Sequence, residues 1–286
     1  MGLQIATNVS ALNSYRNLSA NQNDVSKSLE KLSSGLRINR AADDAAGLAI
    51  SEGLRSQVNG LNVAARNAQD GISVIQTAEG QLTEVHSILQ RVRDLAVQAG
   101  NDSNNADSRG AITTEVTQLV DELERIADSA NFNGIQLLDG TAGAAGDGTL
   151  SFQVGADGSA SSQITVDLSS ANIKALSTQL RTDIVTTDGF ADPTVAAATI
   201  TTVDTAIKSV SSARADLGAV QNRFESTINS LQVSAENLSA AKSRIADTDM
   251  ASEMVKYTAA NILAQAGTAM LAQANQSGQG VLQLLR

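Results

Sequence analysis

Apolar residues recur at every seventh position along two long stretches of the chain, and this period constrains the fold more than any other feature. The first stretch consists of Leu54, Leu61, Ala68, Ile75, Leu82, Leu89 and Ala96. The second consists of Leu217, Phe224, Leu231, Leu238 and Ile245. A heptad of apolar residues lines one side of an α-helix. The sequence therefore predicts two long helices, each with a continuous apolar seam.

Two further helical signals lie between these stretches. Apolar residues at three- and four-residue spacing run through 107–129, after the polar turn 100–106. This segment can fold back antiparallel on the helix before it. Asp192 and Pro193, the one proline of the chain, form a favourable helix start, because Asp caps free N–H groups and Pro needs no donor at the first position.

The middle of the chain, residues 131–192, differs from both flanks because it holds eight of the 21 glycines. Leu150, Phe152 and Val154 alternate with polar residues, as do 164, 166 and 168. Turn-forming residues separate the two runs. We expect turns and a small β-hairpin with one buried face.

These elements together predict a mainly α fold. The fold is a long antiparallel coiled-coil rod with a small β-hairpin region in the middle and with the two chain ends together at one end. We divide the chain into terminal segments 1–43 and 247–286, helices of the rod at 44–130 and 193–246, and the hairpin region 131–192.

The two ends of the chain are almost free of charge. Residues 257–285 contain no charged side chain, and residues 1–23 contain only Arg16. Glutamines and asparagines interrupt the apolar residues, so these segments are unsuited to insertion into a membrane. They also lack the charges that solvate a surface helix. We therefore expect them to be buried against other protein chains.

The composition argues against several kinds of chemistry. The formal net charge is −10, and no basic cluster is interleaved with aromatic residues, so we expect no nucleic-acid partner. There is no cysteine and a single histidine, His86, which excludes thiolate and two-histidine zinc sites. A lone histidine on such a helix is far more often packing or surface than catalysis. We expect no cofactor and no enzymatic activity.

Several longer motifs resemble one protein family. Residues 33–39, 43–50 and 65–73 are similar to the N-terminal region of bacterial flagellins, and 217–224 and 281–286 are similar to its C-terminal partner. The resemblance covers about the first 140 and the last 90 residues, in the correct order. The short middle suggests a minimal form without large outer domains.

The resemblance implies a structural subunit that polymerises with itself into the flagellar filament for swimming, with its terminal helices forming the inner core. The expected filament-core residues are Leu3, Ile5, Leu12, Leu18, Ile262, Leu263, Leu271, Val281, Leu282, Leu284 and Leu285. It also implies unfolded export through the flagellar secretion channel, which fits the absence of a basic segment before an apolar stretch near Met1. The extracellular filament would meet flagellar cap and hook-associated proteins, and an export chaperone would bind the C-terminal segment.

A second resemblance concerns recognition by animal hosts. Residues 89–98 are similar to the flagellin stretch contacted by Toll-like receptor 5. The positions that match are Gln90, Arg91, Leu95, Gln98 and, on the neighbouring helix, Glu115.

Two alternatives use similar helices. A hook-filament junction protein shares terminal helices of this kind but should not form long filaments. A cytoplasmic coiled-coil signalling hairpin also uses heptads, but its seams would extend to the chain ends with charged flanks.

Overall fold

The computed structural model describes residues 8–186, 190 and 192–284. These residues form two compact units. The terminal unit combines both ends of the chain, Met1–Gln57 and Glu236–Arg286, and the central unit is Val58–Ala235. The helices α2 (Ala45–Ala99) and α5 (Pro193–Ala246) each contribute to both units. The division therefore falls inside these helices, whereas the boundaries proposed from the sequence fall close to helix ends.

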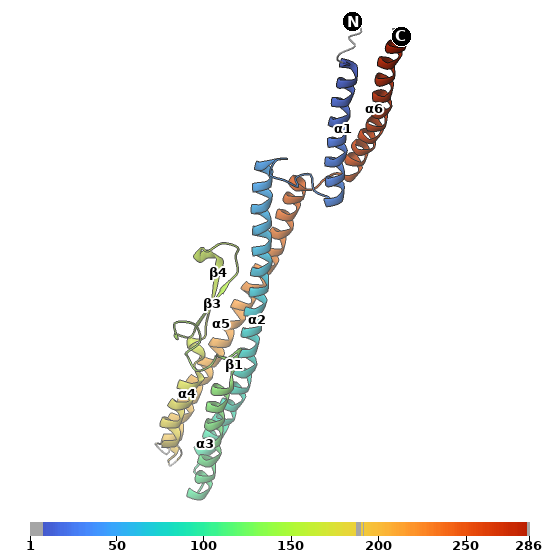
Figure 1. The fold of residues 1–286 in the computed structure, drawn as a ribbon. Helices are drawn as coiled ribbons and strands as arrows, with labels where there is room; N and C mark the ends of the chain where they lie inside the picture. Colours follow the sequence, from blue (N-terminus) through green and yellow to red (C-terminus); the bar gives the residue numbers. More distant parts are fainter. Residues whose placement is uncertain (1–7, 187–189, 191, 285–286) are drawn as a thin grey trace. The chain divides into compact units, whose positions relative to one another are not determined.

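In the terminal unit, α1 (Val9–Ser34) and α6 (Met250–Leu284) lie side by side and antiparallel (Figure 1). Asn8 caps α1 through its side chain, which accepts from the Ala11 N–H at 3.0 Å. The segments that follow α1 and precede α6 are joined by backbone hydrogen bonds. Leu36 pairs with Asp247, and the Arg37 N–H donates to the Ala246 carbonyl at 2.7 Å.

The contact between α1 and α6 follows a heptad that the apolar pattern of the sequence does not display. The less exposed residues of α1 include Ala11, Ser14, Leu18, Asn21, Val25, Ser28 and Leu32. Those of α6 include Glu253, Tyr257, Ala260, Ala264, Gly267, Leu271 and Ala274. Both sets alternate spacings of three and four residues, which is the seam of a coiled coil. Half of these residues are Gly, Ala or Ser, so the two backbones can approach closely at those positions.

In the central unit, α2 and α5 run antiparallel, as predicted, and their heptad seams form much of the core. Ala68, Ile75, Leu82, Leu89 and Ala96 of α2 are buried, together with Leu217 and Phe224 of α5. Two ion pairs at the edge of the seam join the antiparallel helices. Arg93 binds Asp204 at 2.6 Å, and Arg214 binds Glu79 at 3.6 Å.

The helix α3 (Ala106–Ser129) folds back beside α2, which confirms the predicted helical hairpin (Figure 1). The Asn105 side chain caps α3 by accepting from the Ser108 N–H at 2.8 Å. Of the apolar residues at three- and four-residue spacing, Leu119 packs against the same core, and the others are buried: Ile112, Val116, Leu123 and Ile126.

The predicted hairpin is present as β3 (Thr149–Gln153) paired antiparallel with β4 (Gln163–Asp167). Leu150 lies opposite Val166, and Phe152 lies opposite Ile164. The apolar face of the hairpin packs on α5, where the rings of Phe152 and Phe224 meet edge to face with centroids 5.7 Å apart. A second, very short hairpin joins β1 (Asn131–Phe132) to β2 (Ile135–Gln136) through Asn133 and Gly134, both with positive φ.

One expectation for the middle region is wrong. Residues 173–186 were expected to form turns and strands, but they form the helix α4 (Ile173–Leu180) and a π-helical turn, Arg181–Thr186. The Asn172 side chain caps α4 by accepting from the Ala175 N–H at 2.8 Å. Ile173, Leu180 and Ile184 are buried against the core of the central unit. Their spacing matches one helical face, and this burial stabilises the helix.

Candidate functional site: the outer face of the terminal helix pair

The terminal helix pair exposes large apolar side chains on the faces that turn away from its seam. Leu12, Ile262 and Leu263, three of the expected filament-core residues, are 55, 60 and 54 % exposed. Leu18 is buried in the seam, and Leu271 is half-buried there. Side chains that the sequence reasoning did not name, Tyr15, Val255 and Met270, are also exposed. Tyr15 and Met270 lie in the stretches with almost no charge, which is a usable signal, whereas Val255 lies between Glu253 and Lys256.

The remaining expected core residues lie at the extreme ends of the chain. Leu3, Ile5 and Leu285 lie outside the described residues. Val281, Leu282 and Leu284 are in the last turns of α6, where the structure describes the backbone helix only.

Charge is divided very unevenly between the two units. The terminal unit holds ten basic and nine acidic residues, so its formal net charge is +1. The central unit holds the other ten basic and 21 acidic residues, a formal net charge of −11. Copies of the terminal unit can therefore approach one another with little repulsion, whereas copies of the central unit repel.

The residues expected to meet a host receptor lie on α2 and α3 of the central unit. Arg91 donates from Nε and Nη2 to one oxygen of Glu115, at 2.9 and 2.6 Å, and both side chains are exposed. Gln90 and Gln98 are also exposed, and Gln90 Nε2 lies 2.9 Å from His86 Nε2. Leu95 differs, because it is only 2 % exposed and belongs to the core. It supports this surface from beneath rather than forming part of it.

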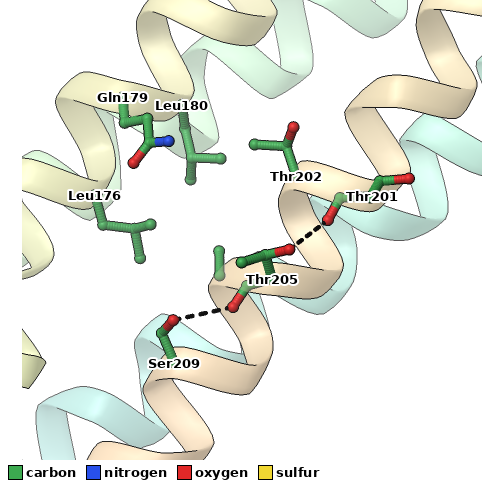
Figure 2. A pocket seen from close by; sticks show the side chains of 8 residues that line it. Leu176, Gln179, Leu180, Thr201, Thr202, Thr205 and Ser209 are labelled. Atoms are coloured by element: carbon green, nitrogen blue, oxygen red, sulfur yellow. Dashed lines mark hydrogen bonds between the residues drawn. The ribbon is translucent and has the colours of Figure 1, made fainter.

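A pocket of about 240 Å³ lies between α4 and α5. Figure 2 shows Leu176, Gln179 and Leu180 on one side and the hydroxyls of Thr201, Thr202, Thr205 and Ser209 on the other. Thr205 and Ser209 donate to carbonyls one turn earlier in their own helix, at 2.9 and 3.1 Å. No acid, base or histidine is among the described residues that line the pocket.

Neither a metal site nor a membrane span is found in the part of the chain that the structure describes. No group of three His, Cys, Asp or Glu side chains there is arranged to hold an ion. No described helix is both long and apolar enough to cross a bilayer. His86 Nδ1 has no hydrogen-bond partner among the described residues, so no carboxylate there orients the ring.

The comparisons with known proteins agree on one family. The family model for the bacterial flagellin N-terminal helical region matches residues 5–143, and the model for the C-terminal helical region matches 200–285. These ranges follow the two parts that carried the resemblance in the sequence.

Three curated relatives match nearly the whole chain. A flagellin of Halalkalibacterium halodurans is 52 % identical over 98 % of this chain and 98 % of its own. A flagellin of Bacillus subtilis is 51 % identical over 99 % of this chain and 100 % of its own. A flagellar filament 33 kDa core protein of Treponema phagedenis is 49 % identical over 98 % of each chain.

The chain is about half identical to these relatives over nearly their full length. Its fold is an antiparallel arrangement of helices, and its terminal helices expose uncharged apolar faces. The chain therefore belongs to the bacterial flagellin family, whose members are structural subunits of the flagellar filament.

Proposed function

We propose that this chain polymerises into a filament by burying the outer faces of its terminal helix pair against other copies of itself. The observation that carries this proposal is the exposure of Leu12, Ile262, Leu263 and Met270 on stretches of the two helices that have almost no charge, residues 9–23 and 257–284. Exposed apolar side chains in such a number mark a surface that another molecule covers. A second copy offers a surface of the same kind.

The contribution of these side chains to the free energy of assembly follows from the apolar area that remains exposed on the pair. Fully burying a Leu, Ile or Met side chain contributes roughly 1.5 to 3 kcal/mol. Because Ile262, Leu263 and Met270 are already partly covered within the pair, covering the rest contributes about 1 kcal/mol for each. Three such side chains shift the concentration needed for assembly by about a hundredfold.

The matching experiment replaces Ile262, Leu263 and Met270 together by Ala, which keeps the helix and removes only the exposed apolar groups. The matched control replaces three exposed valines of the central unit, Val63, Val97 and Val233, by Ala. The critical concentration is measured by sedimentation, and helix content by circular dichroism. We expect the critical concentration to rise about a hundredfold in the first variant and much less in the control. Equal effects in both would refute the proposal.

Electron microscopy of the wild-type polymer separates the proposal from its two alternatives. A filament subunit grows long filaments, a junction protein does not, and a signalling hairpin forms none. The family matches over nearly the full length of filament proteins favour the first.

The location and the accessory partners of the chain are part of the same proposal. The subunit leaves the cell unfolded through the flagellar secretion channel, and the polymer is extracellular. Cysteine is absent, so no disulfide has to form before or after passage. The C-terminal segment 247–286, which presents the exposed apolar residues of α6, is the part that an export chaperone would cover. Cap and hook-associated proteins would meet the same terminal helices at the ends of the polymer.

Toll-like receptor 5 is the proposed host partner of the central unit. Support comes from Gln90, Arg91, Gln98 and Glu115, which are exposed together on adjacent helices. The Arg91–Glu115 ion pair holds both charged groups in a fixed orientation, which favours a specific polar contact.

A further inference from the structure

The seam between α1 and α6 contains little information about register. Ala11, Ser14, Ala260, Ala264 and Ala274 are nearly alike in size. Coiled coils fix their register through large side chains or through buried polar ones. The larger side chains Leu18, Val25 and Leu32 themselves recur at every seventh position, so the seam can pack one heptad out of step with similar contacts. The backbone bridge between Leu36 and Asp247 anchors the pair at one end. Beyond that bridge, a contact that breaks the repeat is needed to select the observed register.

Ser28 and Glu253, two polar members of the seam, form the contact that breaks this repeat. Each is 7 % exposed, and Glu253 is the one ionisable side chain that is buried in the described part of the chain. The Ser28 hydroxyl donates to Glu253 Oε1 at 2.7 Å, and Lys256 donates to Oε2 at 3.1 Å. A buried carboxylate that loses its donor destabilises the arrangement in which it is left.

A one-heptad slip can be followed residue by residue. In one direction the slip moves Glu253 away from Ser28 to the level of Asn21. It also moves Leu18 from Gly267 to the level of Ala260. In the observed register, a Cβ added to Gly267 would lie 3.3 Å from Leu18 Cδ1, so Leu18 already uses the space that a side chain would need. The slipped register therefore loses both fits.

We propose that the Ser28–Glu253 hydrogen bond is the specificity-determining contact that selects the register of α1 against α6. The fit of Leu18 over Gly267 supports the same choice. The register decides which exposed apolar residues of the two helices lie level with each other. It therefore shapes the surface that the pair presents, whatever that surface binds.

Disulfide trapping tests the register directly, because the chain has no cysteine of its own. Ala264 lies level with Asn21 when counted from Leu18 over Gly267, and with Asn17 when counted from Ser28 and Glu253. Ala11 reaches the level of Ala264 only after a slip. One chain therefore carries Asn21→Cys with Ala264→Cys, and the other carries Ala11→Cys with Ala264→Cys. Intramolecular cross-linking is measured by mass spectrometry after mild oxidation. We expect the first pair to exceed the second by about tenfold.

The variants then remove the contact in two ways. Glu253→Ala should lower the ratio of the two cross-links several-fold, to the preference that the fit of Leu18 over Gly267 and the backbone bridge provide. The double variant Ser28→Ala/Glu253→Leu replaces the polar pair by apolar groups, which often preserves or increases stability. It should keep the total cross-linking and show the same lowered ratio. Asp24→Ala removes an exposed carboxylate of α1 and should leave the ratio unchanged.

Each other outcome counts against the proposal. An unchanged ratio in Glu253→Ala would show that the backbone bridge and the other seam residues select the register by themselves. Loss of both cross-links in the double variant would show that the contact holds the helices together rather than setting their register. A ratio of the two cross-links near one in the wild-type background would overturn the proposal. Filament growth is not needed for any of these measurements, so they stand apart from the proposed assembly.

Discussion

The ring of Phe224 on α5 lies against the backbone of Gly71 on α2. A Cβ built on Gly71 would come within 2.8 Å of Phe224 Cζ, closer than real side chains approach. Phe224 is fully buried, and its ring also meets Phe152 of β3. The ring therefore has little room to move aside. This contact places the two long helices and the hairpin around one point of the central unit.

Gly71→Ala is expected to destabilise the central unit. Alanine favours helix over glycine by about 1 kcal/mol, but overpacking a filled core typically costs about 1 to 3 kcal/mol. The cost of the clash should exceed the gain in helix propensity, and the midpoint of thermal unfolding should shift to lower temperature. Gly80→Ala in the same helix has open space around its Cβ and should raise stability by about 1 kcal/mol. A stabilised Gly71→Ala variant would show that the ring can move aside.

The long-range order of the fold was predictable because large apolar residues follow the heptad in α2 and α5. The seam of α1 and α6 was not, since Ala11, Ser14 and Ala264 carry no clear apolar signal. The helix α4 was also missed. Its start at Asn172, followed by Ile173, Leu176 and Leu180 at helical spacing, was a usable signal inside a region dominated by glycine.

The candidate surfaces were predictable to a similar degree. Absence of charge pointed to the terminal helices as the assembly surface, and Leu12 and Ile262 are exposed there. Absence of charge could not separate Leu12 from Leu18, which is buried in the seam, because both are leucines on the same helix. Only the structure reveals that Arg91 pairs with Glu115 and that Leu95 is buried.

Replacing Arg91 by Ala is expected to weaken stimulation of cells that carry Toll-like receptor 5. A charge-assisted hydrogen bond at an interface contributes about 2 kcal/mol, which corresponds to a loss of roughly tenfold or more. Stability should change little, because the Arg91–Glu115 pair is exposed. Arg125→Ala breaks the comparable exposed pair with Glu122 elsewhere on α3 and serves as the control. A wild-type chain that does not stimulate such cells would exclude the receptor proposal.

Assembly is expected to become more favourable as salt is added. The formal charge of −11 on the central unit makes neighbouring copies repel, and salt screens this repulsion over about 10 Å at 0.1 M. Asp94→Asn combined with Asp216→Asn removes two exposed negative charges from this unit. The double variant should assemble at lower concentration in low salt, by a few-fold, and converge with the wild type in high salt. A critical concentration that rises with salt in both proteins would contradict this account.

Acid is expected to release the terminal helix pair through Glu253. The hydrogen bond from Ser28 and the charge of Lys256 hold the pKa of the Glu253 carboxyl below its usual value, although burial acts in the opposite direction. Lys31 of α1 adds a further attraction. Because the folded pKa is lowered, the contribution to stability is complete above the unfolded value of about 4.3. It is lost as pH falls below that value and through the folded pKa.

The two tyrosines of the chain provide a reporter for this loss. Tyr15 lies on α1, and Tyr257 lies in the seam of α6. The chain has no tryptophan to mask their signal. Tyrosine circular dichroism of the assembled protein should therefore decline in acid. Glu253→Gln cannot titrate, so its signal should lose the part of the pH dependence that this carboxyl causes. The difference in stability between the two proteins should be largest at neutral pH and should vanish in acid. Glu30 also has a lowered pKa, through its hydrogen bonds with Arg40 and Asn39, so Glu30→Gln measures the share of a more exposed carboxyl. If Glu253→Gln follows the wild-type acid curve without change, the buried contact with Ser28 does not govern the acid response of the pair.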